Sequence, residues 1–100
     1  MVYVPVDFND PELKVLLNED WKLSEDKKFI SKEFDFKDFI TTFSFMTQIA
    51  LQSEKFNHHP EWFNVYNRLK ITWSTHELGG LSQHDLQMAQ FCDEVYFKFK

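Results

Sequence analysis

The spacing of apolar residues changes along this 100-residue chain, and this change limits the possible folds more than any other feature. Within residues 29–36, one phase of a period of two is taken by Ile30, Phe34 and Phe36, with Lys32 in the same phase and able to extend its amine to solvent at an edge. Residues 37–56 follow the spacing of a helix, and the period of two returns over residues 63–74. Such a chain is expected to form a mixed α+β fold.

Local signals divide the rest of the chain into elements. A helix is predicted from Asp10 to about Asn18, because a capping residue precedes a proline at the first helical position. Residues 21–36 predict a hairpin, since a charged turn separates two apolar runs. Residues 63–74 predict a second hairpin that turns near Asn67.

The last helix is predicted to begin after Gly79-Gly80, with Ser82 as its N-cap and Asp85 completing a capping box. One face of this helix would carry Leu86, Ala89, Cys92 or Asp93, and Tyr96. The predicted fold is α+β, a four-stranded antiparallel sheet with three helices on one face in the order α-β-β-α-β-β-α. A chain of this length buries one core, so residues 1–100 are expected to form a single domain.

The longest predicted helix, over residues 37–56, carries apolar residues on two sides. The main stripe consists of Phe39, Ile40, Phe43, Met46 and Ala50, and the second row of Phe45, Ile49 and Phe56. In so small a domain we expect the second row to contact another subunit rather than a loop or strand of the same chain. With 12 phenylalanines, 3 tryptophans and 3 tyrosines, the composition also favours self-association, as a homodimer or homotetramer.

Charge and composition argue against several classes of protein. The formal net charge of −5 repels nucleic acid and anionic membrane surfaces, so neither is expected as a direct partner. No stretch approaches the ~20 apolar residues of a membrane span, and residues 1–7 lack the features of a signal peptide. The single cysteine, Cys92, fits a reducing compartment. A cytoplasmic protein is the expectation.

Three of the four histidines are predicted in or beside chain reversals, where functional side chains are common. They are His58, His59 and His76, whereas His84 is expected to be a solvated residue in the first turn of the last helix. Histidine titrates near neutral pH, so two of them facing one substrate can supply an acid and a base. A zinc site is the alternative, but adjacent histidines on extended backbone normally diverge, which weakens it.

The residues around these histidines resemble the signature of the pterin-4a-carbinolamine dehydratase family. The matching residues are the run EKFNHHPEWFNVYN from Glu54 to Asn67, then Ile71-Thr72, Ser74-Thr75-His76, Gly80-Leu81-Ser82 and Asp85. The resemblance extends from about the first predicted helix to the last, and the His-His-Pro, His, Asp pattern is specific. Trp73 stands where the resemblance leads us to expect an aliphatic residue.

The resemblance implies an enzyme that dehydrates 4a-hydroxytetrahydrobiopterin to quinonoid dihydrobiopterin, in tetrahydrobiopterin recycling, with neither metal nor organic cofactor. His58 and His76 would exchange protons with N5 and the 4a hydroxyl of the pterin, in an order that the sequence leaves open. His59 would bind and orient the substrate. The second substrate-contacting stretch would be Thr75, His76, Glu77 and Leu78.

The remaining residues of the expected site have supporting roles. Pro60 would restrict the backbone of the preceding histidine. Glu54 and Asp85 could orient a histidine, although for Asp85 helix capping is an equally good explanation. Trp62 would either stack on the pterin or pack in the core or pocket wall.

An interaction protein is the second functional hypothesis. Animal members of the family also act as dimerisation cofactors for a homeodomain transcription factor, a coactivator-type role that would add a nuclear fraction to the cytoplasmic one. The two-sided long helix is compatible with such a partner, and self-association explains the same surface.

Overall fold

The computed structural model describes residues 2–99 and confirms the predicted order of elements. The elements are α1 (Pro11–Asn18), β1 (Lys22–Leu23), β2 (Ile30–Asp35), α2 (Phe39–Phe56), β3 (Glu61–Val65), β4 (Arg68–Trp73), the 3-10 turn η1 (His76–Leu78) and α3 (Gln83–Lys98). The capping residue Asp10 accepts a hydrogen bond from the amide of Glu12, which explains where α1 begins.

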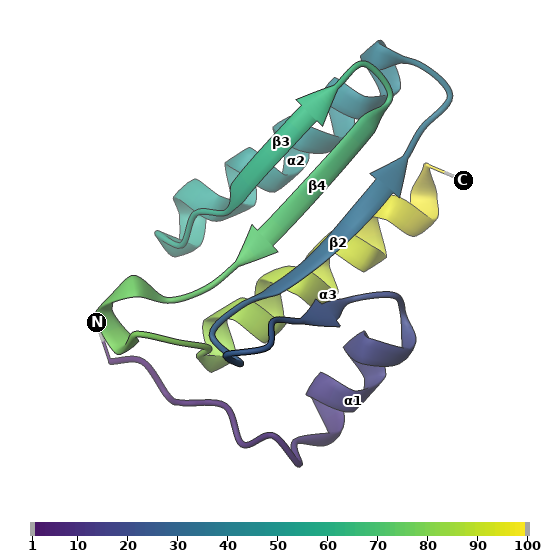
Figure 1. Cartoon of the computed structure of the whole chain (residues 1–100). Coiled ribbons are helices and arrows are strands. Elements are labelled where there is room, and N and C mark those ends of the chain that lie inside the picture. The colour runs from purple at the N-terminus through teal and green to yellow at the C-terminus, as the bar shows by residue number, and fades with distance from the viewer. Residues whose placement is uncertain (1, 100) are drawn as a thin grey trace.

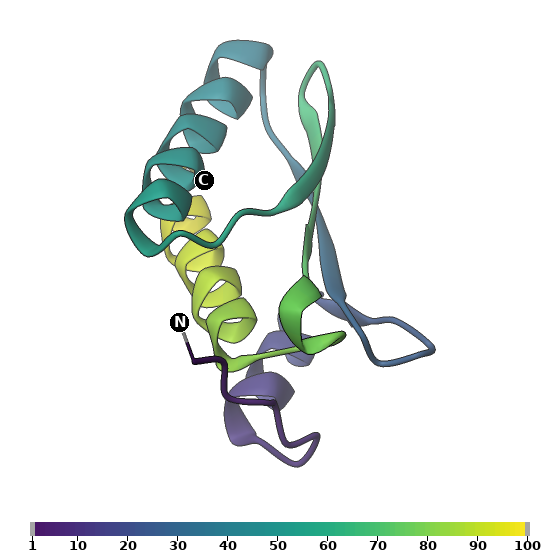
Figure 2. The same ribbon diagram turned by 90° about the vertical axis from the view of Figure 1, so that its left-hand side faces the viewer.

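The four strands form one antiparallel sheet in the order β1-β2-β4-β3 (Figure 1). Seen from the side, α2 and α3 cover one face of the sheet, and α1 lies at the end of that layer next to α3 (Figure 2). No helix among residues 2–99 covers the opposite face. None of the helices in this part of the chain is long and apolar enough to cross a membrane.

The core lies between the sheet and the helices, and the period of two in the sequence explains it. Ile30 pairs with Trp73 and Phe34 with Leu69 across β2 and β4, and all four side chains are buried. Lys32 shares their phase, so its side chain lies on the face of β2 that α3 covers and its amine does not reach solvent at an edge. Its side chain is 10% exposed, and Nζ pairs with Asp93 of α3 at 2.8 Å.

The prediction that the second row of α2 contacts another subunit is wrong for Phe45 and Ile49, whereas the third member of the row, Phe56, is 44% exposed. Phe45 and Ile49 are 0% exposed and pack in the core of their own chain, whereas Ile40 of the main stripe is 77% exposed. The buried row also contains Thr42 and Ser53, whose hydroxyls donate to backbone carbonyls one turn earlier at 2.8 Å. Because these bonds satisfy the hydroxyls within the helix, a row with two polar residues can face the core.

Candidate active site

The end of α2 directs His58 into the protein. Asn57 adopts the left-handed conformation (φ 52°), and the amide of His58 donates to the carbonyl of Ser53 at 3.0 Å. This is the hydrogen bond that ends a helix in a Schellman motif, and asparagine tolerates the left-handed conformation better than most residues. The chain therefore reverses sharply, and the His58 residue is only 6% exposed.

The carboxylate of Asp85 holds the His58 ring from the first turn of α3. Asp85 is 0% exposed, and its Oδ1 lies 2.6 Å from Nε2 of His58. Its Oδ2 accepts from the hydroxyl of Thr75 at 2.8 Å and from the amide of Ser82 at 2.9 Å, the second of which is part of the predicted capping box. An ionised carboxylate only accepts hydrogen bonds, so this contact fits the His58 tautomer with its hydrogen on Nε2, and Nδ1 is the ring nitrogen that Asp85 does not contact.

Aromatic rings surround His58 on several sides. Its ring stacks on Trp73 with 5.7 Å between centroids and 12° between planes. Tyr3 and His84 lie at centroid distances of 6.2 Å and 5.7 Å. The expectation that His84 is solvated is wrong, because its residue is half-buried and its Nδ1 is buried with no hydrogen-bond partner.

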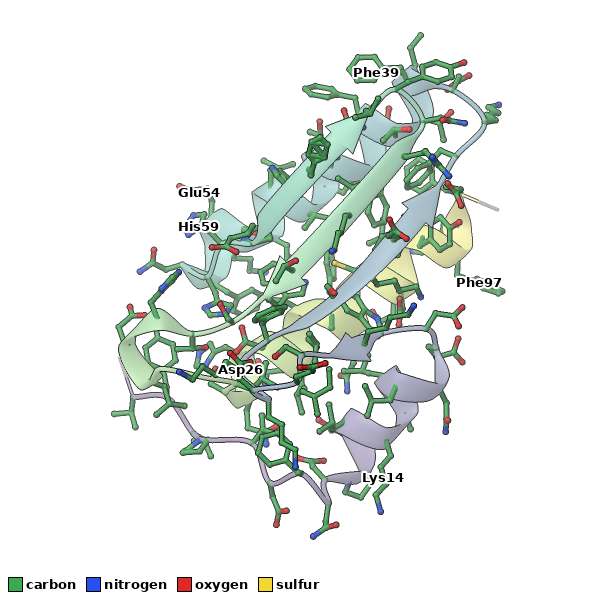
Figure 3. The ribbon with its side chains drawn as sticks, viewed as in Figure 1. Lys14, Asp26, Phe39, Glu54, His59 and Phe97 are labelled. Carbon is green, nitrogen blue, oxygen red and sulfur yellow. The ribbon has the colours of Figure 1, made fainter. Side chains whose placement is uncertain are left out.

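His59 points away from its neighbour, as expected for adjacent residues on extended backbone. Its Nε2 lies 2.6 Å from Oε1 of Glu54, and both side chains are exposed. Figure 3 shows this pair together near the end of α2. Glu54 therefore orients His59, while Asp85 orients His58.

His76 is the first residue of η1, in a short loop between β4 and α3. The backbones of Thr75 and Gly80 exchange hydrogen bonds at 2.9 Å and 3.3 Å and close this loop. The His76 side chain is 84% exposed, and its Nε2 lies 3.9 Å from Oε1 of Glu61. Because Glu61 follows Pro60, this contact joins the His76 loop to the loop that carries the other two histidines.

A pocket of about 490 Å³ lies between these two loops. It is lined by Tyr3, Asn57, Glu77 and Leu78. Asn57 directly precedes His58, and Glu77 directly follows His76. The pocket therefore lies beside the loops of the two histidines that the resemblance assigns to proton transfer, and its lining consists of their sequence neighbours rather than the histidines themselves.

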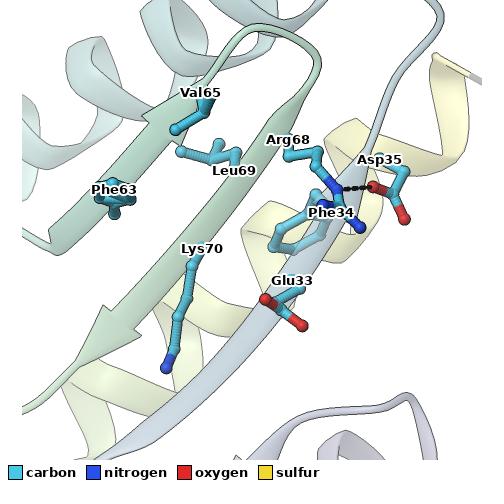
Figure 4. Close-up of a pocket in the computed structure, with 8 residues that line it drawn as sticks. All are labelled: Glu33, Phe34, Asp35, Phe63, Val65, Arg68, Leu69 and Lys70. Carbon is cyan, nitrogen blue, oxygen red and sulfur yellow. Dashed lines mark ion pairs between the residues drawn. The ribbon is translucent and has the colours of Figure 1, made fainter.

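A second hollow, of about 400 Å³, lies on the uncovered face of the sheet (Figure 4). It is lined by Glu33, Phe34, Asp35, Phe63, Val65, Arg68, Leu69 and Lys70. The lining has no histidine, and the ion pair at 3.6 Å in Figure 4 joins Arg68 to Asp35. Unlike the first pocket, this hollow has no lining residue that adjoins a candidate histidine in the sequence, so it is the weaker candidate for acid/base chemistry.

The other expected site residues take structural positions in this structure. Trp62 is paired with Ile71 across β3 and β4 and packs against the core. This position agrees with the packing role expected for it. Pro60 is half-buried, and Leu78 is on the pocket wall. Among residues 2–99, no three His, Cys, Asp or Glu side chains gather as a metal site would require, and each candidate histidine has its own carboxylate partner.

The model of the family described as pterin 4 alpha carbinolamine dehydratase matches residues 7–95. This chain belongs to that family. The dehydratase signature residues quoted from the sequence all lie within the matched range.

Relatives agree with this assignment. The chain is 54% identical over 78 residues to a pterin-4-alpha-carbinolamine dehydratase of Drosophila melanogaster, a match that covers 78% of this chain and 41% of the relative. The chain thus spans about two fifths of the length of that relative. A solved structure described as a transcriptional coactivator/pterin dehydratase from Brucella melitensis has a TM-score of 0.82 at 36% identity, covering 92% of this chain and 98% of that one.

A second solved structure is similar in fold alone. It is described as a pterin dehydratase-like protein that is a RuBisCO assembly factor in the alpha-carboxysome. Its TM-score is 0.66 at 22% identity, covering 77% of this chain and 89% of that one. The dehydratase fold is therefore shared by proteins described with different functions.

Two residues beside the pocket were not expected from the sequence. Asn57 has a recognisable signal, because asparagine after a long helical pattern is a common helix terminator. Tyr3 has none, since it precedes the residues that match the dehydratase family, and only the folded chain brings it near His58.

Proposed function

We propose that this chain dehydrates 4a-hydroxytetrahydrobiopterin to quinonoid dihydrobiopterin by histidine acid/base catalysis, in tetrahydrobiopterin recycling. The observation that carries this proposal is the pocket between the His58 and His76 loops, together with the buried carboxylate that fixes the His58 ring. Membership of the dehydratase family and the Drosophila relative support it.

The proposed reaction needs two proton transfers on opposite sides of the pterin. A base removes the proton from N5, whose electron pair forms the N5–C4a double bond as the C4a–O bond breaks. An acid protonates the departing hydroxyl, which leaves as water. Atoms and electrons balance without an electron acceptor, so a group that titrates near neutrality suffices on each side.

The positions of the histidines support distinct roles for them. His58 and His76 act as the two proton-transfer groups, and the buried Asp85 keeps Nδ1 of His58 able to exchange a proton. His59, exposed and oriented by Glu54, binds the pterin. Thr75 positions Asp85, whereas Glu77 and Leu78 line the pocket with Asn57.

Binding to this pocket can be mapped by backbone amide NMR spectra recorded during titration with biopterin, the oxidised and unreactive pterin. We expect shifts for Asn57, Glu77 and Leu78 and unchanged signals for Phe63 and Lys70, which line the hollow on the uncovered face of the sheet. The reverse pattern would place the ligand on the sheet and contradict the proposed site.

Self-association through α2 is the second part of the proposal. The exposed stripe of α2 is defined by Phe39, Ile40, Phe43 and Leu51. Exposed apolar patches of this kind mark protein contacts, and a second copy of the chain, in a homodimer or homotetramer, is the partner we favour. A coactivator-type role is the alternative. It is kept because the similar Brucella structure is described as a transcriptional coactivator/pterin dehydratase.

Ile40→Glu is expected to reduce the mass of the particle measured by light scattering during gel filtration, because it places a charge in the exposed stripe. Val15→Glu on α1, also at an exposed apolar residue, should leave the mass unchanged. A parent chain that is monomeric, or an Ile40 variant with the parent's mass, would contradict self-association through α2.

We place this activity in the cytoplasm, with a nuclear fraction under the coactivator alternative. The support is the free and fully buried Cys92, since unpaired thiols are typical of reducing compartments. Burial also raises the pKa of this thiol far above its ordinary value, so Cys92 is not a nucleophile at neutral pH.

A further inference from the structure

The segment before α1 is held against the start of α3 by backbone contacts. We call Val2–Val6 the N-terminal arm; it runs along the chain that leads into α3 (Figure 1). The amide of Val6 donates to the carbonyl of Leu81 at 3.3 Å, and the amide of Gln83 donates to the carbonyl of Val4 at 2.9 Å. These bonds fix the arm in a region that directly precedes Asp85.

The arm places Tyr3 beside the candidate catalytic groups. The Tyr3 ring meets His84 edge-on at 5.0 Å between centroids and lies 6.2 Å from the ring of His58. Its hydroxyl donates to Oε2 of Glu77 at 3.4 Å. Tyr3 is also one of the residues that line the pocket between the two histidine loops.

The surroundings of Tyr3 suit contact with a flat and polar ligand. Two causes raise the pKa of the Tyr3 phenol above its ordinary value: the larger is partial burial, and the smaller is the nearby carboxylate of Glu77. The hydroxyl is therefore a hydrogen-bond donor at neutral pH. The ring is anchored on one side by His84 and half-buried, which lowers the entropic cost of ordering it when a ligand binds. Tyrosine combines a flat apolar ring with a polar tip, as many ligand pockets require.

We infer that Tyr3 is a further binding residue of this pocket, whose ring packs against the heterocyclic ring system of the substrate and holds it near His58. This inference rests on the proposed function and adds a residue outside the range that matches the dehydratase family. Tyr3 transfers no proton in this scheme. It therefore contributes to substrate affinity and leaves the chemical step unchanged.

The test compares Tyr3→Ala, Tyr3→Phe and the parent chain in dehydration kinetics and in calorimetric titration with biopterin. We expect Tyr3→Ala to raise KM and the Kd for biopterin about three- to tenfold, the usual range for an aromatic contact, with kcat within about twofold. Tyr3→Phe keeps the ring and should stay within about twofold of the parent in both constants. Val2→Ala, in the same arm and largely exposed, is the matched control, and the Tm of each variant checks folding.

The outcomes separate this inference from the proposed function. A Kd for Tyr3→Ala equal to that of the parent, or a fall in kcat at constant KM, would overturn the role of Tyr3. A parent that binds biopterin without accelerating dehydration would refute the proposed function, and the Kd ratio would still support or overturn the role of Tyr3. A parent that neither binds nor reacts would overturn both.

Discussion

His58→Ala is expected to lower kcat for pterin dehydration by about 10²- to 10⁴-fold, the usual contribution of one positioned acid or base. The two nitrogens of the His58 ring have different surroundings. Nε2 lies 2.6 Å from the buried carboxylate of Asp85, and the proposed mechanism uses the other nitrogen, Nδ1, to exchange a proton with the substrate. Stopped-flow measurement of the dehydration at saturating substrate gives kcat directly.

His58→Gln separates the chemical loss from a structural one. Removal of the imidazole takes a donor from a fully buried carboxylate, which lowers stability by itself. Glutamine can donate an N–H to Asp85 but cannot exchange a proton near neutral pH. We expect the free energy of unfolding of the glutamine variant to lie within about 1 kcal/mol of that of the parent. Its kcat should fall as far as that of the alanine variant. A glutamine variant with the parent's kcat would show that His58 does not transfer a proton.

Asp85→Asn is expected to lower the free energy of unfolding by about 3 kcal/mol, measured by urea denaturation. Three donors converge on this carboxylate, from His58, Thr75 and Ser82. An amide has one acceptor oxygen, so its NH₂ group would face at least one of these donors across a buried space. We also expect kcat to fall, because an amide can hold the His58 ring in the wrong tautomer.

Glu94→Gln is the matched control for Asp85→Asn. Glu94 is on the same helix but exposed, so its replacement should change the free energy of unfolding by less than about 0.5 kcal/mol. If Asp85→Asn lowers the free energy of unfolding no more than this control does, the three hydrogen bonds contribute little to stability. The carboxylate then cannot be the group that fixes His58.

The order of elements could be predicted because burial here follows the period of the sequence. Ile30, Phe34, Leu69 and Trp73 alternate in the chain and meet in the core. The orientation of α2 could not be predicted in the same way. Its buried face includes Thr42, whose hydroxyl is satisfied by the helix backbone, so the most apolar stripe is not the most buried one.

The site was predictable where a local signal exists. The capping box marked Asp85, and the two roles expected for it, capping and orienting a histidine, prove to be compatible. Oδ1 holds His58 while Oδ2 accepts from the amide of Ser82. The half-buried state of His84 and the position of Tyr3 depend on contacts between the N-terminal arm and α3, which no period or motif in the sequence encodes.

The most direct test of the central claim is the rate of 4a-hydroxytetrahydropterin dehydration in metal-chelated buffer, for the parent chain beside His76→Ala. The proposed function predicts that the parent accelerates the reaction in the presence of the chelator, and that this acceleration falls by about 10²-fold or more in the variant. No acceleration by the parent, or an acceleration that the chelator abolishes, would contradict metal-free dehydration by the histidines beside this pocket.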